Sequence, residues 1–162
     1  MQTTPDVIPL FIADIYELAG ALRGRGDAIA RVVGQTQARW QVLSAASDVR
    51  KTVPQIARRL GLSRQNVQRI ADVLVHESLA RFVGNPDHQT SPYFMLTDAG
   101  HETLAALNKT ARSQHVKLSA HLKGLDLEGL QRGIRAVRTA VDTLEGTVAR
   151  RGAKRRHAEA TR

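Results

Sequence analysis

The stretch from Thr52 to Leu79 constrains the fold of this chain more than any other, because it predicts two short helices joined by a tight turn. Apolar residues recur there at the i, i+3, i+4 and i+7 spacing of a helix with one buried face. They are Val53, Ile56, Ala57 and Leu60 in the first helix, and Val67, Ile70, Ala71 and Leu74 in the second.

The residues at the ends of these two helices support the same interpretation. Thr52 can cap the first helix, and Gln55 stands where the partner in a capping box is expected. Gly61 suits the left-handed residue that ends a helix, and Ser63 can cap the second helix. The turn is therefore expected at residues 60–63.

The second helix is expected to expose a polar face opposite its apolar stripe. At about 100° per residue, Gln65, Gln68 and Arg69 point away from the stripe, and Arg64 and Asn66 flank them near the helix start. Gln, Asn and Arg can each make two hydrogen bonds to a purine edge in the major groove of DNA. This face therefore predicts contact with bases. The alternative is an ordinary solvated helix face, which is also rich in polar residues.

A β-hairpin is predicted directly after the second helix. Leu79–Val83 and Tyr93–Thr97 are short, apolar-rich runs, and the polar segment between them is bounded by prolines. A helix, a turn, a helix and a hairpin in this order make a winged helix.

In the order and spacing of its motifs, the chain resembles the multiple-antibiotic-resistance regulator (MarR) family over roughly Pro5 to Arg150. The resemblance rests on the segments Gln35–Leu43, Ile56–Leu74, Asn85-Pro86 and Leu96–Gly100, together with Arg81. It implies a homodimer with interleaved N- and C-terminal helices, and a small-molecule effector, often phenolic, bound between the winged helix and the dimer helices.

Two positions depart from the pattern of the family. Many members carry Asp-Arg-Arg at the tip of the wing, where an arginine enters the minor groove, whereas this chain has His88-Gln89-Thr90. Many members also carry a glycine just after the recognition helix, where this chain has Ser78. The candidate DNA-binding residues are Ser63, Arg64, Gln65, Asn66, Gln68, Arg69, Arg81, His88, Gln89 and Thr90.

The positive charge of the chain is concentrated in two segments. The formal net charge is +9, and residues 50–81 hold seven basic and two acidic residues, which gives +5. Residues 150–162 hold six basic residues and one acidic residue, which again gives +5 and leaves −1 for the remainder. Positive charge on the proposed DNA-binding unit and on the tail predicts a polyanionic partner. A solubilising tail is the alternative for the last segment.

Long helices are expected on both sides of the winged helix. A first helix from Val7 to about Val33 could bend at the Gly24 and Gly26 region, and Gly34 ends it. Thr36 caps a helix through Ala46 in which Trp40 is expected in the core, and a role in lining a ligand site is the alternative. Thr97 caps a helix to about residue 123, and Asp126 caps the last one.

The last helix carries a heptad stripe that needs an apolar partner along its length. Packing on the preceding helix of the same chain is one alternative. The first and last helices together offer more apolar surface than a small winged helix can cover, so a homodimer is predicted. The candidate dimerisation residues are Ile8, Phe11, Ile15, Leu127, Leu130, Ile134, Val137, Val141 and Leu144.

Several classes of function find no support in the sequence. The chain has no cysteine, so thiolate chemistry within it is excluded. The histidines form no metal-ligand spacing, and there is no phosphate-binding loop or nucleophile turn. We therefore expect no enzyme activity, cofactor or metal. No signal sequence or membrane span is predicted, which favours a soluble, cytoplasmic protein without a membrane partner.

The sequence thus predicts a mainly helical winged helix-turn-helix protein with a small β-hairpin wing. Residues 1–35 form an N-terminal dimerisation helix, 36–97 the DNA-binding domain, 98–150 the C-terminal dimerisation helices and 151–162 a basic, disordered tail. The predicted function is a ligand-responsive repressor that binds double-stranded DNA as a homodimer on a pseudo-palindromic operator. The alternative is an architectural dimer that coats DNA with little sequence preference.

Overall fold

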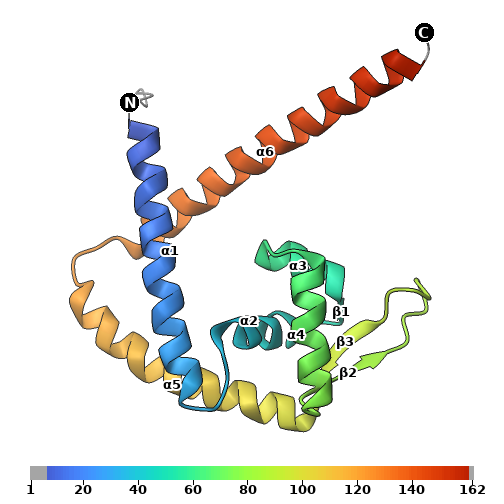
Figure 1. Ribbon diagram of the computed structural model, residues 1–162. Helices are drawn as coiled ribbons and strands as arrows, with labels where there is room; N and C mark the ends of the chain where they lie inside the picture. Colours follow the sequence, from blue (N-terminus) through green and yellow to red (C-terminus); the bar gives the residue numbers. More distant parts are fainter. Residues whose placement is uncertain (1–6, 161–162) are drawn as a thin grey trace. The chain divides into compact units, whose positions relative to one another are not determined.

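The computed structural model describes the backbone of residues 7–160 and the side chains of residues 7–144 (Figure 1). The chain forms two compact units, Met1–Lys117 and Leu118–Arg162. The elements follow one another in the order α1 (Val7–Arg31), α2 (Gln37–Ala46), β1 (Lys51–Thr52), α3 (Val53–Leu60), α4 (Arg64–His76), β2 (Ala80–Val83), β3 (Tyr93–Leu96), α5 (Asp98–His121) and α6 (Leu127–Ala160). The predicted fold class, mainly helical with a small hairpin wing, is confirmed.

The helices of the central stretch begin and end where their capping residues predict. The backbone N–H of Thr52 donates to Gln55 Oε1 at 2.8 Å, and Gly61 ends α3 with a φ of +65°. Ser63 Oγ accepts from the N–H of Asn66 at 3.2 Å and so starts α4. Thr97 Oγ1 accepts in the same way at the start of α5. Local hydrogen bonds therefore fix the boundaries of α3, α4 and α5.

The wing belongs to a three-stranded antiparallel sheet in the order β1-β3-β2. The predicted strands form β2 and β3, with Arg81 opposite Met95 and Phe82 opposite Phe94. The sequence did not predict β1, which pairs with β3 through Lys51 opposite Phe94. Two residues are too few to show the alternating pattern of a strand, and their pairing with β3 is what makes them one.

The core of the first unit lies between α2, α3, α4, the sheet and α5. The apolar stripe of α4 is buried throughout, and in α3 only Leu60 is half-buried. The rings of Phe82 and Phe94 meet edge to face with centroids 5.8 Å apart. The largest fully buried side chains are Phe94, Leu43, Ile56, Leu74, Leu107, Val42 and Val67. The wing and both short helices therefore share a single core, which fixes their relative positions.

Two positions after α4 show how tightly the hairpin is joined to the helices. Ser78 adopts a left-handed φ of +59°, at the position where many members of the resembled family carry glycine. Gly100, in the first turn of α5, lies against the carbonyl oxygen of Leu79, and a Cβ there would overlap that atom. The same carbonyl accepts from the N–H of Thr97 at 3.1 Å. A side chain at position 100 is therefore incompatible with this packing.

Helix α1 is continuous from Val7 to Arg31, so it is not broken in the Gly24 and Gly26 region. Gly26 allows α1 to approach the start of α2 closely, since a Cβ there would lie 2.8 Å from Gln37 Cγ. Asp27 then accepts from the N–H of Gln37 at 2.9 Å. These glycine-dependent contacts with α2 offset the low helix propensity of the segment.

The second unit is dominated by α6, whose start is capped by Asp126 through the N–H of Gly129 at 2.8 Å. The helix continues to Ala160 and so includes most of the segment that was expected to be disordered. Residues 151–160 are rich in Ala, Arg, Lys and Glu, which favour a helix once one is already nucleated upstream. Residues 161–162 lie outside the described part. No described helix is both long and apolar enough to cross a membrane.

Candidate nucleic-acid interface

Helix α4 presents the predicted polar face. Arg64, Gln65, Gln68 and Arg69 are exposed, and Asn66 is half-buried. This face lies opposite the buried stripe because four apolar residues at helical spacing commit the other side to the core. The polar side chains therefore project from a helix whose opposite side is packed into the core.

Hydrogen bonds along α4 join these side chains in pairs. Gln68 Nε2 donates to Asp72 Oδ1 at 2.7 Å, and Arg69 Nη2 donates to Asn66 Oδ1 at 3.3 Å. A hollow of about 480 Å³ on this face is lined by Arg64, Gln65, Gln68, Arg69, Asp72 and Val73. Asp72 falls on the same exposed face of the helix, but its bond to Gln68 was not predicted, although the i, i+4 spacing was the available signal.

The wing tip is a folded turn held by Asn85. Its side-chain nitrogen donates to the carbonyl of Ser91 at 2.9 Å, and its side-chain oxygen accepts from the N–H of Asp87 at 3.1 Å. Thr90 Oγ1 and His88 Nδ1 lie 3.2 Å apart at the tip. The wing therefore presents His88, Gln89 and Thr90 as exposed side chains on an ordered loop.

A groove of about 590 Å³ separates the start of α3 and α4 from the wing. It brings together the predicted residues Arg64, Gln68, His88 and Thr90. Its lining residues are Thr52, Val53, Pro54, Gln55, Arg58, Arg64, Gln68, Phe82, His88, Thr90, Ser91 and Pro92. Arg58 was missed in the sequence analysis, because its position facing the wing depends on how the hairpin folds back.

The remaining predicted residues lie outside this groove. Gln65 and Arg69 line the separate hollow along α4, and Arg81 is exposed on β2 opposite Met95. Ser63 is occupied by its capping bond to the N–H of Asn66. Six of the ten predicted residues thus line two neighbouring hollows that share Arg64 and Gln68, whereas Ser63, Asn66, Arg81 and Gln89 line neither.

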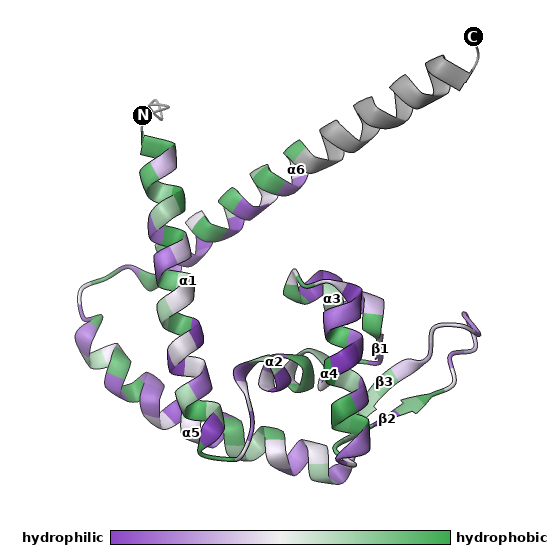
Figure 2. Cartoon of the chain, in the orientation of Figure 1, coloured by the Kyte–Doolittle hydropathy of each residue, from purple (hydrophilic) through white to green (hydrophobic). Residues whose placement is uncertain are grey.

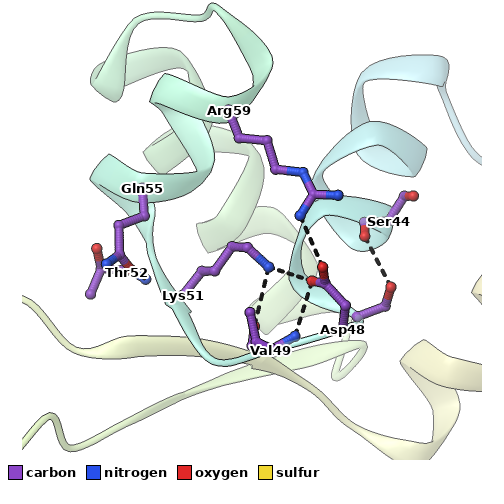
Figure 3. A network of polar contacts seen from close by, with 8 residues as sticks. Ser44, Asp48, Val49, Lys51, Thr52, Gln55 and Arg59 are labelled. Carbon is purple, nitrogen blue, oxygen red and sulfur yellow. Dashed lines mark hydrogen bonds and ion pairs between the residues drawn. The ribbon is translucent and has the colours of Figure 1, made fainter.

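A network of charges joins the end of α2 to α3 (Figure 3). Asp48 accepts from Lys51 Nζ, from Arg59 Nη1 at 3.0 Å and from the N–H of Val49 at 3.0 Å. These donors, led by Lys51 and Arg59, hold the pKa of Asp48 well below its usual range. The network therefore ties β1 to the last turn of α3.

A second ion pair ties the far end of α4 to α2. Arg39 Nη2 lies 2.9 Å from Glu77 Oε1, and its Nη1 lies 3.1 Å from Oε2 of the same carboxylate. Arginine and carboxylate form this two-pronged pair with defined geometry. The last turn of α3 and the C-terminal end of α4 are thus each held by an ion pair.

Trp40 lies between the core and a surface hollow. It is half-buried and packs against the core, and its Nε1–H donates to Asn108 Oδ1 on α5 at 3.2 Å. It also lines a hollow of about 400 Å³ together with Gln37, Gln41, Ser44, Ala45, Arg59, Leu60 and Asn108. The predicted core position is therefore at the edge of the core rather than inside it.

The candidate dimerisation residues are exposed in both units. On α1 the exposed fractions of Ile8, Phe11 and Ile15 are 47%, 40% and 37%. Figure 2 shows hydrophobic residues repeated along α1 and along the coloured part of α6. The exposed set on α6 is Leu127, Leu130, Ile134, Val137, Val141 and Leu144. Each of these residues on α1 and α6 is at least 37% exposed.

Among the residues that the structure describes, no group of three or more histidine, aspartate or glutamate side chains lies close enough to hold a metal ion.

Comparison with known proteins identifies one matching family model. Residues 33–89 match the model of the MarR family, a range that covers the helix-turn-helix and most of the wing. The uncharacterized protein Rv2011c of Mycobacterium tuberculosis is 52% identical over 106 residues, which are 65% of this chain and 74% of that protein.

Solved structures of regulators share the fold. The Mycobacterium tuberculosis transcriptional regulator MosR, solved in complex with DNA, superposes with a TM-score of 0.69 at 20% identity, over 82% of this chain and 96% of that one. The MarR family regulator Sco5413 of Streptomyces coelicolor has a TM-score of 0.71 at 22% identity, over 87% and 98%. The capped helix-turn-helix, the hairpin wing and these matches agree: the chain belongs to the MarR family of winged-helix transcriptional regulators.

Proposed function

We propose that this protein is a sequence-specific DNA-binding repressor that acts as a homodimer on a pseudo-palindromic operator and responds to a small molecule. The observation that carries the proposal is the exposed face of α4, where Gln65, Gln68 and Arg69 stand on a packed helix. These side-chain types have the donor and acceptor geometry that distinguishes purines in the major groove. Such a regulator acts in the cytoplasm, where the bacterial chromosome lies.

The groove between α4 and the wing has the position expected for one DNA strand. If α4 occupies the major groove and the wing the adjacent minor groove, the sugar-phosphate backbone between the two grooves must pass between these elements. Arg58 and Arg64 line this groove, and His88 stands on its wing side. Arginine side chains at such a place bind phosphates and carry no sequence information. In this arrangement the groove beside the wing binds the DNA backbone, and the hollow along α4 contacts the bases.

The second copy of the chain is the partner that we propose for α1 and α6. Large exposed apolar residues on long helices are costly to leave in water, at about 25 cal/mol per Å² of apolar surface. Ile8, Phe11 and Ile15 on α1 and the heptad residues of α6 supply such faces. An isologous interface also places two α4 helices on a two-fold axis, as a pseudo-palindrome requires.

The effector site that we propose is the hollow beside Trp40. It has one aromatic wall, the amides of Gln37, Gln41 and Asn108, and the guanidinium of Arg59, a combination that suits an aromatic molecule with a polar group. Trp40 is the only tryptophan in the chain, so its fluorescence reports on this site alone. Titration with a phenolic carboxylate should quench this emission saturably, and a Gln41→Ala variant should shift the midpoint. A linear, non-saturating response would reject the site.

DNase footprinting on the promoter region of the protein's own gene tests the main proposal. A regulator protects one or two short segments with two-fold symmetry at low concentration. Uniform protection along the whole fragment would instead support the architectural alternative, which is favoured by a wing tip that carries no arginine. The footprint therefore separates the two functions in one experiment.

A further inference from the structure

One carboxylate lies on the face of α4 that we propose meets DNA. Asp72 is exposed, and within the described part of the chain its side chain bonds only to Gln68. Arg64 and Arg69 line the same hollow. An acidic side chain here repels phosphates, so it does not serve general attraction to DNA. The position of Asp72 on this face is therefore better explained by its contact with Gln68 than by attraction to DNA.

The bond between Gln68 and Asp72 fixes which way the Gln68 amide points. A carboxylate can only accept hydrogen bonds, so the amide nitrogen, and not the amide oxygen, must face Asp72. The observed Nε2 to Oδ1 distance of 2.7 Å agrees with this chemistry. Gln68 Oε1 and the second hydrogen on Nε2 therefore stay available for another partner.

The atoms that remain available match one base edge. A glutamine recognises adenine by accepting from N6–H with its oxygen and donating to N7 with one amide hydrogen. That readout uses one of the two amide hydrogens and leaves the other for Asp72. A free glutamine must lose the freedom of its side chain on binding, whereas Gln68 is already restrained.

We propose that Asp72 is a positioning residue that orients Gln68 to recognise adenine in the major groove, so that the two side chains determine specificity at one base pair of each half-site. This inference rests on the proposed function. It adds a residue that contacts no base in this arrangement, and it assigns a base to Gln68.

The test uses the full-length protein and selection of bound duplexes from a random pool, which requires no known operator. The variants are Gln68→Ala, Asp72→Asn and the double variant. Asparagine at position 72 has nearly the same size as aspartate but can also donate, so it no longer fixes the orientation of the Gln68 amide. Glu102→Gln removes the same charge from an exposed position on α5 and serves as the matched control. Circular dichroism serves to check that each variant is folded.

We expect the wild type to prefer adenine at one base pair of each half-site by about tenfold, the scale of one good two-bond contact. Gln68→Ala and Asp72→Asn should each remove most of that preference at the same base pair, and the double variant should lose no more. Glu102→Gln should keep it. A purely structural role for Asp72 would lower all affinities together and leave the base preference intact.

Two results would overturn the inference while the proposed function stands. In one, Asp72→Asn keeps the full adenine preference of the wild type. In the other, Asp72→Asn and Gln68→Ala lose preference at different base pairs, which would mean that Asp72 contacts a base itself. A wild-type protein that enriches no sequence would overturn the proposed function and this inference with it.

Discussion

Arg64 and Arg69 lie five residues apart on α4, yet we predict that their removal has different consequences. Arg69 lines only the hollow on the exposed face, whereas Arg64 also lines the groove toward the wing. Arg69→Ala should therefore remove a base contact, and Arg64→Ala a phosphate contact. The two variants lose the same charge from the same helix, so each is the control for the other.

The magnitudes follow from the two kinds of contact. Loss of a two-bond base contact costs about 1–3 kcal/mol of discrimination per half-site, and a homodimer loses it twice, so Arg69→Ala should cost about 2–6 kcal/mol. Loss of a phosphate contact lowers the slope of log affinity against log salt by about 0.9, hence by about 2 for the dimer with Arg64→Ala. Arg69 already donates to Asn66, so part of its donor capacity is used and the lower half of its range is expected.

The assay is a fluorescence titration of the selected operator and of a scrambled duplex at several salt concentrations. Arg69→Ala should weaken operator binding and leave scrambled binding nearly unchanged. Arg64→Ala should weaken both by similar factors and flatten the salt dependence. Equal losses on both duplexes for Arg69→Ala would refute the assignment, because the side chain would then be holding phosphate.

Three further predictions concern other parts of the molecule. Val137→Glu should place an unpaired charge in the proposed α6 seam, and analytical ultracentrifugation should then show monomer or unfolded protein; a folded dimer would contradict the seam. Ser78→Gly should raise the free energy of unfolding by about 0.5–1 kcal/mol in urea titration, since it relieves a left-handed serine, and an unchanged midpoint would refute this strain. The pKa of Asp48 is depressed in the folded protein, so the stabilisation that its carboxylate contributes is present above its unfolded pKa of about 3.9 and is lost as the pH falls below that value. In thermal melts below about pH 3.9, Asp48→Asn should therefore lose less stability on acidification than the wild type.

The parts of the fold that depend on local contacts could be predicted from the sequence. Ser63 and Thr97 cap helices through bonds that span three residues, and Gly61 ends a helix through its own backbone conformation. Such features depend only on neighbours in the chain, so residue type and spacing are sufficient. The apolar stripe of α4 is equally local, because the helical period alone places it on one face.

The parts that depend on distant contacts could not be predicted. Arg39 and Glu77 are 38 residues apart, and no pattern in the sequence connects them before α2 and α4 pack together. Lys51 and Thr52 become a strand only because β3 lies beside them. Arg58 lines the groove because the hairpin folds back toward α3. In each case the partner is set by tertiary packing, which single-sequence patterns do not encode.

The free energy of the base contacts from α4 can be compared with the free energy that specific binding requires. At about 1 kcal/mol each, contacts from Gln65, Gln68 and Arg69 give about 3 kcal/mol, less than the roughly 4–10 kcal/mol that separates specific from non-specific binding. Two copies of α4 on one operator give about 6 kcal/mol, which falls within that range. The chain cannot enlarge the face of α4 without losing its buried stripe. We therefore infer that specificity requires two copies of the face, and we propose that the exposed apolar residues of α1 and α6 hold the second copy.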